Sequence, residues 1–329
     1  NIGYTGTPVN DRRFSNDELC TAFDKMTALA KYMDRSGYDT LWMAEHHFQP
    51  EGYECLPNII LLGVHLSHLT QNIHIGCGFN IAPMWHPLRL AEDWATADVL
   101  TNGRITFGVG RGYHTREIET FGAPLLDQDS NRELFEEQVE IIFKAFNNES
   151  FSHHGKNYTI PPKVPYRGYD LKEITLVPRP KSTPVECWQP IQSASDRAFD
   201  FMAKHGMKGI IGGGSSEGGA MDEIITKFQT AYQKSGYNVS LGENLSIGYH
   251  FYIADSKEKA LTEAAGYYEE NLKMFGPLRL VRALSDQQIE DMGDPSKAPH
   301  AGLPTIQDAE KSGGFLAGPA DLIVEKLKA

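Results

Sequence analysis

The chain has 329 residues, of which 31 are basic and 43 acidic, so its formal net charge is −12. With 40% hydrophobic and 22% charged residues, the composition is that of an ordinary globular protein with enough apolar residues for a substantial core. The acidic balance argues against a nucleic-acid partner and against an anionic membrane surface, and no run of eighteen apolar residues predicts a transmembrane helix.

The first predicted element is a helix that begins at a capping box, Ser15 to Glu18. Apolar residues then recur at helical spacing from Leu19 to Met33, and Gly37 ends the helix. Short apolar runs without polar alternation predict six strands that are buried on both faces, as parallel strands are. In chain order these strands are Asp39–Ala44, Ile73–Phe79, Ile105–Arg111, Val185–Ile191, Lys208–Gly213 and Leu245–Ile253, with Ile2–Tyr4 as the remnant of a further strand. The helices predicted between and after them are Pro57–Thr70, His86–Leu100, Asn131–Phe146, Asp196–His205, Met221–Ser235, Ser256–Met274 and Gly318–Lys328.

Short strands that alternate with helices define an α/β protein. No glycine-rich dinucleotide loop follows the strand at 39–44, so a Rossmann domain is disfavoured and an eight-stranded (β/α)8 TIM barrel is favoured. We predict a single barrel domain over residues 1–329, with long insertions at the catalytic mouth at about 147–184 and 275–318. No eighth strand is recognisable behind the helix Gly318–Lys328, which predicts a truncated C-terminal βα unit.

Polar residues gather where the predicted strands end, which in a barrel is the catalytic mouth. They are Glu45, His46 and His47; Asn80; Arg111, Gly112, Tyr113 and His114; Gln192, Ser193 and Ser195; and His250. A metal hydrolase is one interpretation of the Glu-His-His cluster. However, adjacent side chains of a strand point to opposite faces, and the His-x-His spacing that would place two ligands on one face does not occur. We therefore predict no metal site.

Two further patterns leave alternatives open. Ser193, Ala194 and Ser195 precede the helix predicted at 196–205, so this turn could bind a phosphate with help from Arg111, or Ser195 could be only an N-cap. Glycines interrupt the third and fourth barrel strands, either because the core is closely packed or because a flat ligand lies against bare backbone. These glycines are Gly76, Gly78, Gly108, Gly110 and Gly112.

The four cysteines lie far apart in the sequence and include no C-x-x-C pair. They are Cys20, Cys55, Cys77 and Cys187. This spacing indicates reduced thiols rather than a disulfide framework or a structural zinc site, which predicts a cytoplasmic protein.

Five motifs in collinear order resemble those of bacterial luciferase and its flavin-dependent monooxygenase relatives. They are Ala44-Glu45-His46-His47-Phe48, His86-Pro87-Leu88-Arg89-Leu90-Ala91-Glu92-Asp93, Gly103-Arg104-Ile105-Thr106-Phe107-Gly108, Arg111-Gly112-Tyr113-His114 and Phe121-Gly122. The resemblance covers about residues 16 to 147 and is weaker over Ser193–Gly206 and Gly318–Asp321.

The resemblance implies a luciferase-like barrel that uses dioxygen and FMN, with the FMN reduced by a separate flavin reductase. It implies a monooxygenase that forms a C4a-(hydro)peroxyflavin and inserts one oxygen atom into a small apolar or carbonyl-bearing organic substrate. His46 matches the catalytic histidine of the family. An imidazole titrates near neutral pH, so it can donate a proton to the peroxide or stabilise it. The resemblance also implies a homodimer.

Other matched positions are expected to hold the cofactor. Gly78 and Phe79 match the segment that lines the isoalloxazine ring, followed by Asn80; Arg111 matches the arginine at the flavin phosphate, followed by Gly112 and Tyr113; and Ser193, Ala194 and Ser195 form a second phosphate-binding turn. Glu45, His47 and His250 are expected to orient the site or to contact substrate. The luciferases carry glutamate where this chain has Ala194 and cysteine where it has Gly110, so light emission is not implied.

Alternative functions divide into three classes. A deazaflavin (F420)-dependent oxidoreductase of the same fold would transfer hydride without oxygen, and the paired histidines favour the monooxygenase over it. A non-catalytic flavin-binding protein would bind FMN without oxygen uptake, which the presence of both His46 and Arg111 argues against. A metal hydrolase is the third class.

Overall fold

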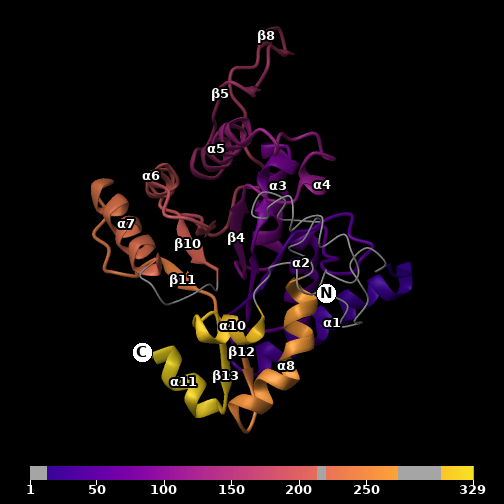
Figure 1. The fold of residues 1–329 in the computed structure, drawn as a ribbon. Helices are drawn as coiled ribbons and strands as arrows, with labels where there is room; N and C mark the ends of the chain where they lie inside the picture. Colours follow the sequence, from indigo (N-terminus) through magenta and orange to yellow (C-terminus); the bar gives the residue numbers. More distant parts are fainter. Residues whose placement is uncertain (1–12, 213–219, 273–304, 329) are drawn as a thin grey trace. The chain divides into compact units, whose positions relative to one another are not determined.

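A computed structural model describes residues 13–212, 220–272 and 305–328 of the chain (Figure 1). It contains two compact units. We call residues 20–48 and 55–189 the amino-terminal unit, and the described residues of 1–19, 49–54 and 190–329 the carboxy-terminal unit. The predicted strand remnant Ile2–Tyr4 lies outside the described residues, and the prediction of a single domain stays a prediction.

The amino-terminal unit alternates strands with helices, as the sequence predicts. Its elements are α1 (Asn16–Arg35), β1 (Thr40–Met43), α2 (Ile59–Leu69), β2 (His74–Cys77), β3 (Asn80–Ile81), the 3-10 helix η2 (Ala82–Met84), α3 (Pro87–Leu100), β4 (Ile105–Gly110), α4 (Thr115–Ile118), α5 (Gln128–Asn147), β5 (His153–His154), β6 (Thr159–Ile160), β7 (Pro165–Tyr166), β8 (Tyr169–Asp170) and the beginning of β9 (Cys187–Ile191). The capping box is confirmed at the start of α1, where Ser15 N donates to Glu18 Oε2 over 2.8 Å and Glu18 N donates to Ser15 Oγ over 3.4 Å.

The main strands of this unit are parallel and lie side by side in chain order. β1 pairs with β2, β2 with β4, and β4 with β9, while the short β3 also pairs with β4. A doubly wound dinucleotide-binding sheet reverses its strand order, and these strands do not. The predicted α/β class with parallel strands is confirmed, and a complete eight-stranded barrel stays a prediction.

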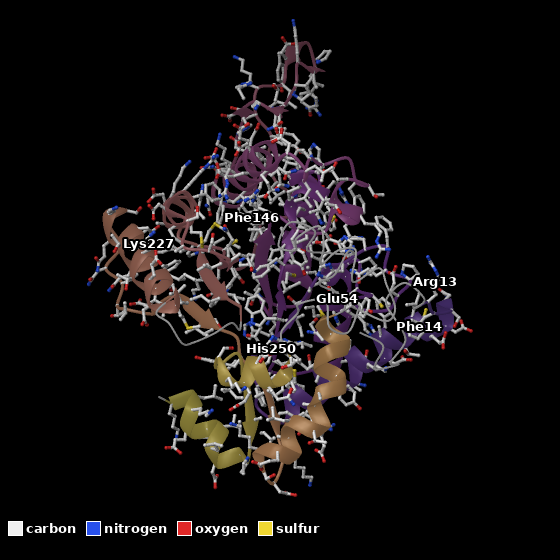
Figure 2. All side chains as sticks on the ribbon, viewed as in Figure 1. Arg13, Phe14, Glu54, Phe146, Lys227 and His250 are labelled. Atoms are coloured by element: carbon white, nitrogen blue, oxygen red, sulfur yellow. The ribbon has the colours of Figure 1, made fainter. Side chains whose placement is uncertain are left out.

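Helices and strands of this unit share one apolar core. α2 packs on β2, α3 packs on α2 and β4, and α5 packs on α3. Between them lie the buried rings of Trp94, Phe107 and Phe146, with centroids 5.2 to 5.5 Å apart (Phe146 is labelled in Figure 2). This core fixes the strand ends from which the polar residues project.

The strand glycines are explained by close packing. A Cβ on Gly76 would lie 2.3 Å from the Trp42 ring, and one on Gly78 would lie 3.1 Å from it. A Cβ on Gly108 would lie 2.1 Å from the backbone oxygen of Cys77. Of the two alternatives for the glycines, the packed core therefore accounts for these three.

The insertion at 147–184 carries two small antiparallel hairpins, β5–β6 and β7–β8. Glu137 on α5 accepts hydrogen bonds from the backbone of Asn157 and Tyr158 near its beginning. The buried carboxylate of Asp98 on α3 accepts from Lys181 N and Ser182 N near its end. The insertion is thus tied to two core helices.

The carboxy-terminal unit also pairs its strands in parallel, β10 with β11 and β12 with β13. Its elements are α6 (Asp196–His205), β10 (Lys208–Ile211), α7 (Ala220–Lys234), β11 (Leu245–Ile247), β12 (His250–Ile253), α8 (Lys257–Leu272), α10 (Ile306–Lys311), β13 (Phe315–Gly318) and α11 (Ala320–Lys328). Ala260, Ala264, Ile306, Phe315 and Ala317 are among the residues that form its buried apolar cluster.

Two predictions in this unit are wrong. The single strand expected at 245–253 is two strands, because the chain changes partner at Gly248-Tyr249: β11 pairs with β10, whereas β12 pairs with β13. The end of the insertion expected at 275–318 is structured as α10 and β13. The apolar run Phe315–Gly318 is only four residues long, too short to stand out from a polar surrounding. Residues 275–304 of that insertion lie outside the described part.

The predicted reduced thiols fit the structure, in which all four cysteines are free. Burial raises the pKa of the Cys77 thiol to about 12 and also raises the pKa of Cys187, so both thiols stay protonated at neutral pH. Within the described ranges, no helix combines the length and apolar character needed to cross a bilayer.

We expect Gly108→Ala to destabilise the protein by about 1–3 kcal/mol, because a backbone oxygen cannot yield to the added methyl group as a side chain can. Gly212→Ala is the matched control, since a Cβ there meets nothing within 4 Å. Urea unfolding of both variants measures the difference, and equal stabilities would contradict the packing explanation.

Candidate active site

The candidate site lies where β1 and β4 end, within the amino-terminal unit. His46 follows β1, and its side chain is only 5% exposed. Its Nδ1 lies 3.1 Å and 3.2 Å from the two carboxylate oxygens of Glu117, which is 2% exposed. Its Nε2 lies 3.3 Å from the hydroxyl oxygen of Tyr113. Both ring nitrogens of His46 therefore have partners from the segment after β4.

A tight turn after β4 brings these two partners to one imidazole. Gly112 has φ +77°, and a Cβ there would lie 2.1 Å from Ile118 Cδ1 and 2.8 Å from Ile81 Cγ2. Only glycine accepts both the positive φ and this close contact. The chain then folds directly into α4, which places Tyr113 and Glu117 four residues apart at the two nitrogens of the His46 ring.

The Glu117 carboxylate is stabilised as an anion. Burial raises the pKa of Glu117, but the hydrogen bond and charge of His46, the charge of His114 and the backbone N–H of His47 together hold this pKa below its ordinary value. The carboxylate is therefore ionised at neutral pH and can only accept hydrogen bonds. It follows that the proton of a neutral His46 sits on Nδ1, and Nε2 accepts from Tyr113.

Glu45 is a second buried carboxylate, and it accepts hydrogen bonds from the segment that follows β2. Its carboxylate is 1% exposed, and it accepts from Ile81 N over 2.8 Å and from Trp85 Nε1 over 2.9 Å. It also lies 3.0 Å from His47 Nε2. Two roles were expected for Glu45 and His47, to orient the site or to contact substrate. These contacts favour the orienting role.

Gly78, Phe79 and Asn80 connect β2 to β3 beside this cluster. Gly78 N donates to Met43 O over 2.7 Å, and Phe79 is half-buried. Asn80 is fully buried and donates from Nδ2 to Gly108 O over 3.0 Å. Its Oδ1 has no hydrogen-bond partner among the described residues. A buried acceptor without a partner beside a half-buried ring is compatible with a planar, hydrogen-bonding ligand such as a flavin.

Arg111 directly follows β4, and its side chain contacts the first turn of α5. Its Nε donates to Asn131 Oδ1 and its Nη2 to Gln128 O, each over 3.1 Å. The guanidinium is thus held in place while the side chain stays partly exposed. A held cation next to a helix N-terminus suits a phosphate group.

The other predicted site residues belong to the carboxy-terminal unit. Ser195 is the N-cap of α6 and accepts from Ala198 N over 3.4 Å, while a phosphate-binding role for this turn stays a prediction. The sequence analysis missed Lys227 (Figure 2), whose Nζ donates to Ala194 O over 3.3 Å and pairs with Asp196. Ser193 is exposed, and so is His250, the first residue of β12.

The sequence analysis also missed Glu117. It lies three residues beyond the last of the strand-end motif residues, in a helix of four residues that periodicity does not detect. The available signal was an acidic residue four positions after Tyr113, the spacing at which two side chains of one helical turn become neighbours.

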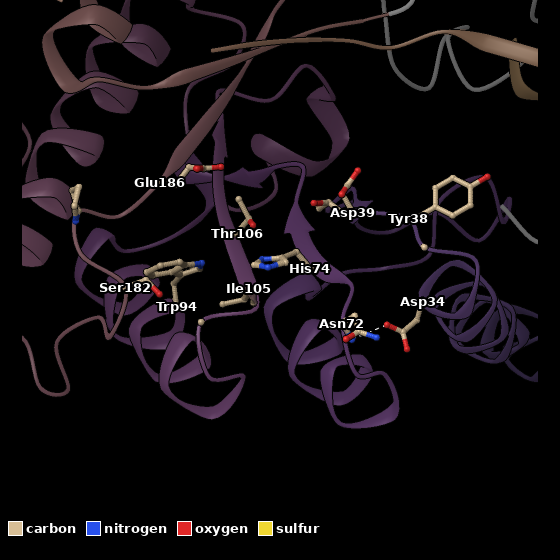
Figure 3. A pocket seen from close by; sticks show the side chains of 14 residues that line it. Asp34, Tyr38, Asp39, Asn72, His74, Trp94, Ile105, Thr106, Ser182 and Glu186 are labelled. Atoms are coloured by element: carbon tan, nitrogen blue, oxygen red, sulfur yellow. Dashed lines mark hydrogen bonds between the residues drawn. The ribbon is translucent and has the colours of Figure 1, made fainter. Parts of the chain in front are cut away.

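A cavity of about 660 Å³ lies at the other ends of the same strands (Figure 3). Asp39, His74, Thr106 and Glu186 line it where β1, β2, β4 and β9 begin. Barrel enzymes carry their chemistry at the carboxyl ends of the strands, so this cavity is not the candidate site. Over the described ranges, no group of three or more histidine, cysteine, aspartate or glutamate side chains is arranged to hold a metal ion.

The comparison with protein families assigns the chain. The model of the luciferase-like monooxygenases matches residues 5–329, so the chain belongs to this family. The family assignment from the five motifs is thereby confirmed.

Curated relatives are named as monooxygenases or are uncharacterized. The oxygenase component of a flavin-dependent trigonelline monooxygenase of Acinetobacter baylyi is 24% identical over 309 residues, which is 93% of this chain and 79% of the relative. The alkanal monooxygenase alpha chain of Aliivibrio fischeri is 24% identical over 73% of this chain and 61% of its own length. An uncharacterized protein of Sinorhizobium fredii is 34% identical over 129 residues, and the match spans only 35% of that relative.

Solved structures show the same fold with two kinds of cofactor chemistry. The oxygenating constituent of 3,6-diketocamphane monooxygenase from Pseudomonas putida, in complex with FMN, has a TM-score of 0.71 at 19% identity over 97% of this chain and 84% of that chain. An F420-dependent secondary alcohol dehydrogenase has a TM-score of 0.69 at 14% identity over 93% of this chain and 85% of that chain. The chain therefore has a luciferase-like fold, which both chemistries use.

We expect Glu117→Gln to lower the free energy of unfolding by about 1–3 kcal/mol at pH 7, because a buried ionic hydrogen bond is lost. Since the folded pKa of Glu117 lies below the unfolded value of 4.5, its stabilisation is present above pH 4.5 and is lost as the pH falls through the folded pKa. The difference in the free energy of unfolding between wild type and variant should therefore become smaller in acid. Urea unfolding at pH 7, 5 and 3.5 measures it, with the exposed Glu149→Gln as control. A gap that does not depend on pH would contradict the ionised Glu117.

Proposed function

We propose that the protein is the oxygenase of a two-component monooxygenase that uses reduced FMN and dioxygen. The observation that carries the proposal is the buried imidazole of His46 between the Glu117 carboxylate and the Tyr113 hydroxyl. Reduced flavin supplies the electrons that activate dioxygen when it is bound. The protein must then supply a proton at the reacting oxygen and keep water away from it. An imidazole held by a carboxylate can supply the proton.

FMN binding is proposed for two sets of residues, each considered within its own unit. In the amino-terminal unit, Gly78, Phe79 and Asn80 would lie against the isoalloxazine ring. Arg111 would bind the phosphate of FMN, and Gly112 and Tyr113 continue the same loop after β4. In the carboxy-terminal unit, Ser193, Ala194 and Ser195 form the second proposed phosphate-binding turn, and Lys227 adds a cation at Ala194 O. Held hydrogen-bond donors and cations support this assignment.

The proposed substrate is a small apolar or carbonyl-bearing organic molecule. Phe48 and Phe121 are 49% and 46% exposed and stack on each other with centroids 5.4 Å apart. Phe121 also meets the ring of His47 over 4.8 Å. Exposed aromatic rings beside a buried polar site are typical of a surface that receives an apolar ligand. The roles of His250 and of the insertions at 147–184 and 275–318 in contacting substrate stay predictions.

The proposed partner is a flavin reductase that delivers reduced FMN transiently. The relative from Acinetobacter baylyi is named as an oxygenase component, which supports a two-component system. A homodimer and a cytoplasmic location are proposed with it, on the family assignment and the reduced thiols.

We expect His46→Ala to be less stable than the wild type, because the buried Glu117 loses a partner. Its folded fraction should still bind FMN but lose substrate oxygenation by about 100- to 10,000-fold, the usual contribution of a positioned proton carrier. Oxygen uptake that remains should then end in hydrogen peroxide. The measurement combines FMN, a generic reductase and a panel of aldehydes, ketones and N-heteroaromatics, with incorporation of 18O as the readout. His65→Ala, at an exposed position of α2, is the control. Oxygenation by His46→Ala at the wild-type rate would show the assignment to be wrong.

Arg111→Met should weaken FMN binding by about tenfold or more, because a charge-assisted hydrogen bond contributes about 1.5–3 kcal/mol. Riboflavin, which lacks the phosphate, should bind the variant and the wild type equally well. Fluorescence quenching of each flavin measures both affinities. An equal loss for FMN and riboflavin would contradict the contact with the phosphate.

The second candidate is an F420-dependent oxidoreductase, because a secondary alcohol dehydrogenase of that kind shares the fold. Hydride transfer needs no dioxygen. Turnover of an alcohol with F420 under argon would favour this candidate, whereas substrate-dependent oxygen uptake with reduced FMN would favour the monooxygenase.

A further inference from the structure

The three side chains of the candidate site differ in their exposure to solvent. His46 and Glu117 are 5% and 2% exposed, whereas Tyr113 is 40% exposed. The Tyr113 hydroxyl lies 3.3 Å from His46 Nε2, and the other ring nitrogen lies on Glu117. A reactant at the surface of this cluster can therefore reach the tyrosine, while the imidazole lies behind it.

The carboxylate of Glu117 determines which groups donate and which accept in the hydrogen bonds of His46. An ionised Glu117 accepts, so Nδ1 of His46 carries a proton. In the neutral imidazole, Nε2 then accepts from the Tyr113 hydroxyl; in the imidazolium, Nε2 donates to it. Among the described residues, Glu117 and Tyr113 lie against this ring, and His114 acts on Glu117 through its charge.

We propose that Tyr113 is the terminal proton-carrying group of the site and that His46 supplies it with protons while Glu117 positions His46. The proposal rests on the proposed oxygenase function and gives it a second catalytic residue. In the proton transfer, the Tyr113 O–H bond breaks as its proton moves to an oxygen anion of the reactant. At the same time the His46 Nε2–H proton moves to the tyrosine oxygen. The tyrosine stays neutral, the imidazolium becomes neutral imidazole, and no electrons are exchanged.

The sequence of the turn supports this role for Tyr113. Gly112 has a positive φ and no room for a Cβ beside Ile81 and Ile118, so the turn that presents Tyr113 is closely constrained. The rings of Tyr113 and His46 also lie with centroids 5.7 Å apart at an interplanar angle of 57°, so the two side chains are ring neighbours as well as hydrogen-bond partners. A hydroxyl held at both ring and backbone is preorganised for proton transfer.

The first test needs no cofactor and no activity. Nitrogen NMR of histidine-labelled protein should show His46 with the proton on Nδ1 at high pH. Tyr113→Phe should shift the Nε2 resonance because its hydrogen bond is lost, and Glu117→Gln should change the tautomer. Tyr166→Phe is the control, since Tyr166 is 43% exposed and lies in the β7–β8 hairpin. A proton on Nε2 in the wild type, or an unchanged resonance in Tyr113→Phe, would overturn the proposal.

The second test measures the relay in turnover. Tyr113→Phe should lower oxygenation by about 100-fold or more when both proteins are measured at saturating FMN. The double variant Tyr113→Phe/His46→Ala should be no slower than His46→Ala, because both changes interrupt one path. Wild-type turnover in Tyr113→Phe, or losses that multiply in the double variant, would overturn the relay. A wild type without oxygen uptake would contradict the proposed function instead, and the NMR result would still decide the relay.

Discussion

A buried carboxylate must be compensated by hydrogen bonds and charge, and this constraint organises the candidate site. Removing an ion from water costs several kcal/mol, so Glu117 is stable in the interior only with partners in place. Its partners are the imidazole of His46 and the backbone N–H of His47, both at the end of β1. Glu117 itself comes from the turn after β4. One ionic contact therefore holds two strand ends together and orients the imidazole at the same time.

A second buried carboxylate extends this organisation away from the histidine. Glu45 accepts from Trp85, and the backbone oxygen of Trp85 accepts from Gln138 of α5. Gln138 also donates to the hydroxyl of Tyr158 in the insertion at 147–184. A continuous set of hydrogen bonds thus runs from the strand end to the insertion. A displaced insertion would leave buried polar groups of this set without partners, so its position and the geometry of the site are coupled.

Most helices and strands could be predicted from the sequence, because a cap or a short apolar run within a few residues determines where each one begins. The capping box at Ser15, the strand at Asp39 and the cap at Ser195 are examples. What the sequence could not supply were contacts between distant segments. Glu117 meets His46 across 71 positions, and Lys227 meets Ala194 across 33, so neither was recognised. The strand β13 was missed because four apolar residues carry too little pattern, and the break at Gly248-Tyr249 depends on which strand lies alongside.

The fold by itself does not choose between oxygen chemistry and hydride chemistry, since relatives of both kinds have similar TM-scores. The choice has to come from what the side chains can do. A hydride transfer moves two electrons and a proton together, and the hydroxyl proton that an alcohol loses at the same time needs only a single base to accept it. A reduced oxygen species accumulates negative charge and needs a proton at a defined place. An imidazole held by a carboxylate on one nitrogen and a phenol on the other moves protons along one line, so the arrangement of Glu117, His46 and Tyr113 favours oxygen chemistry.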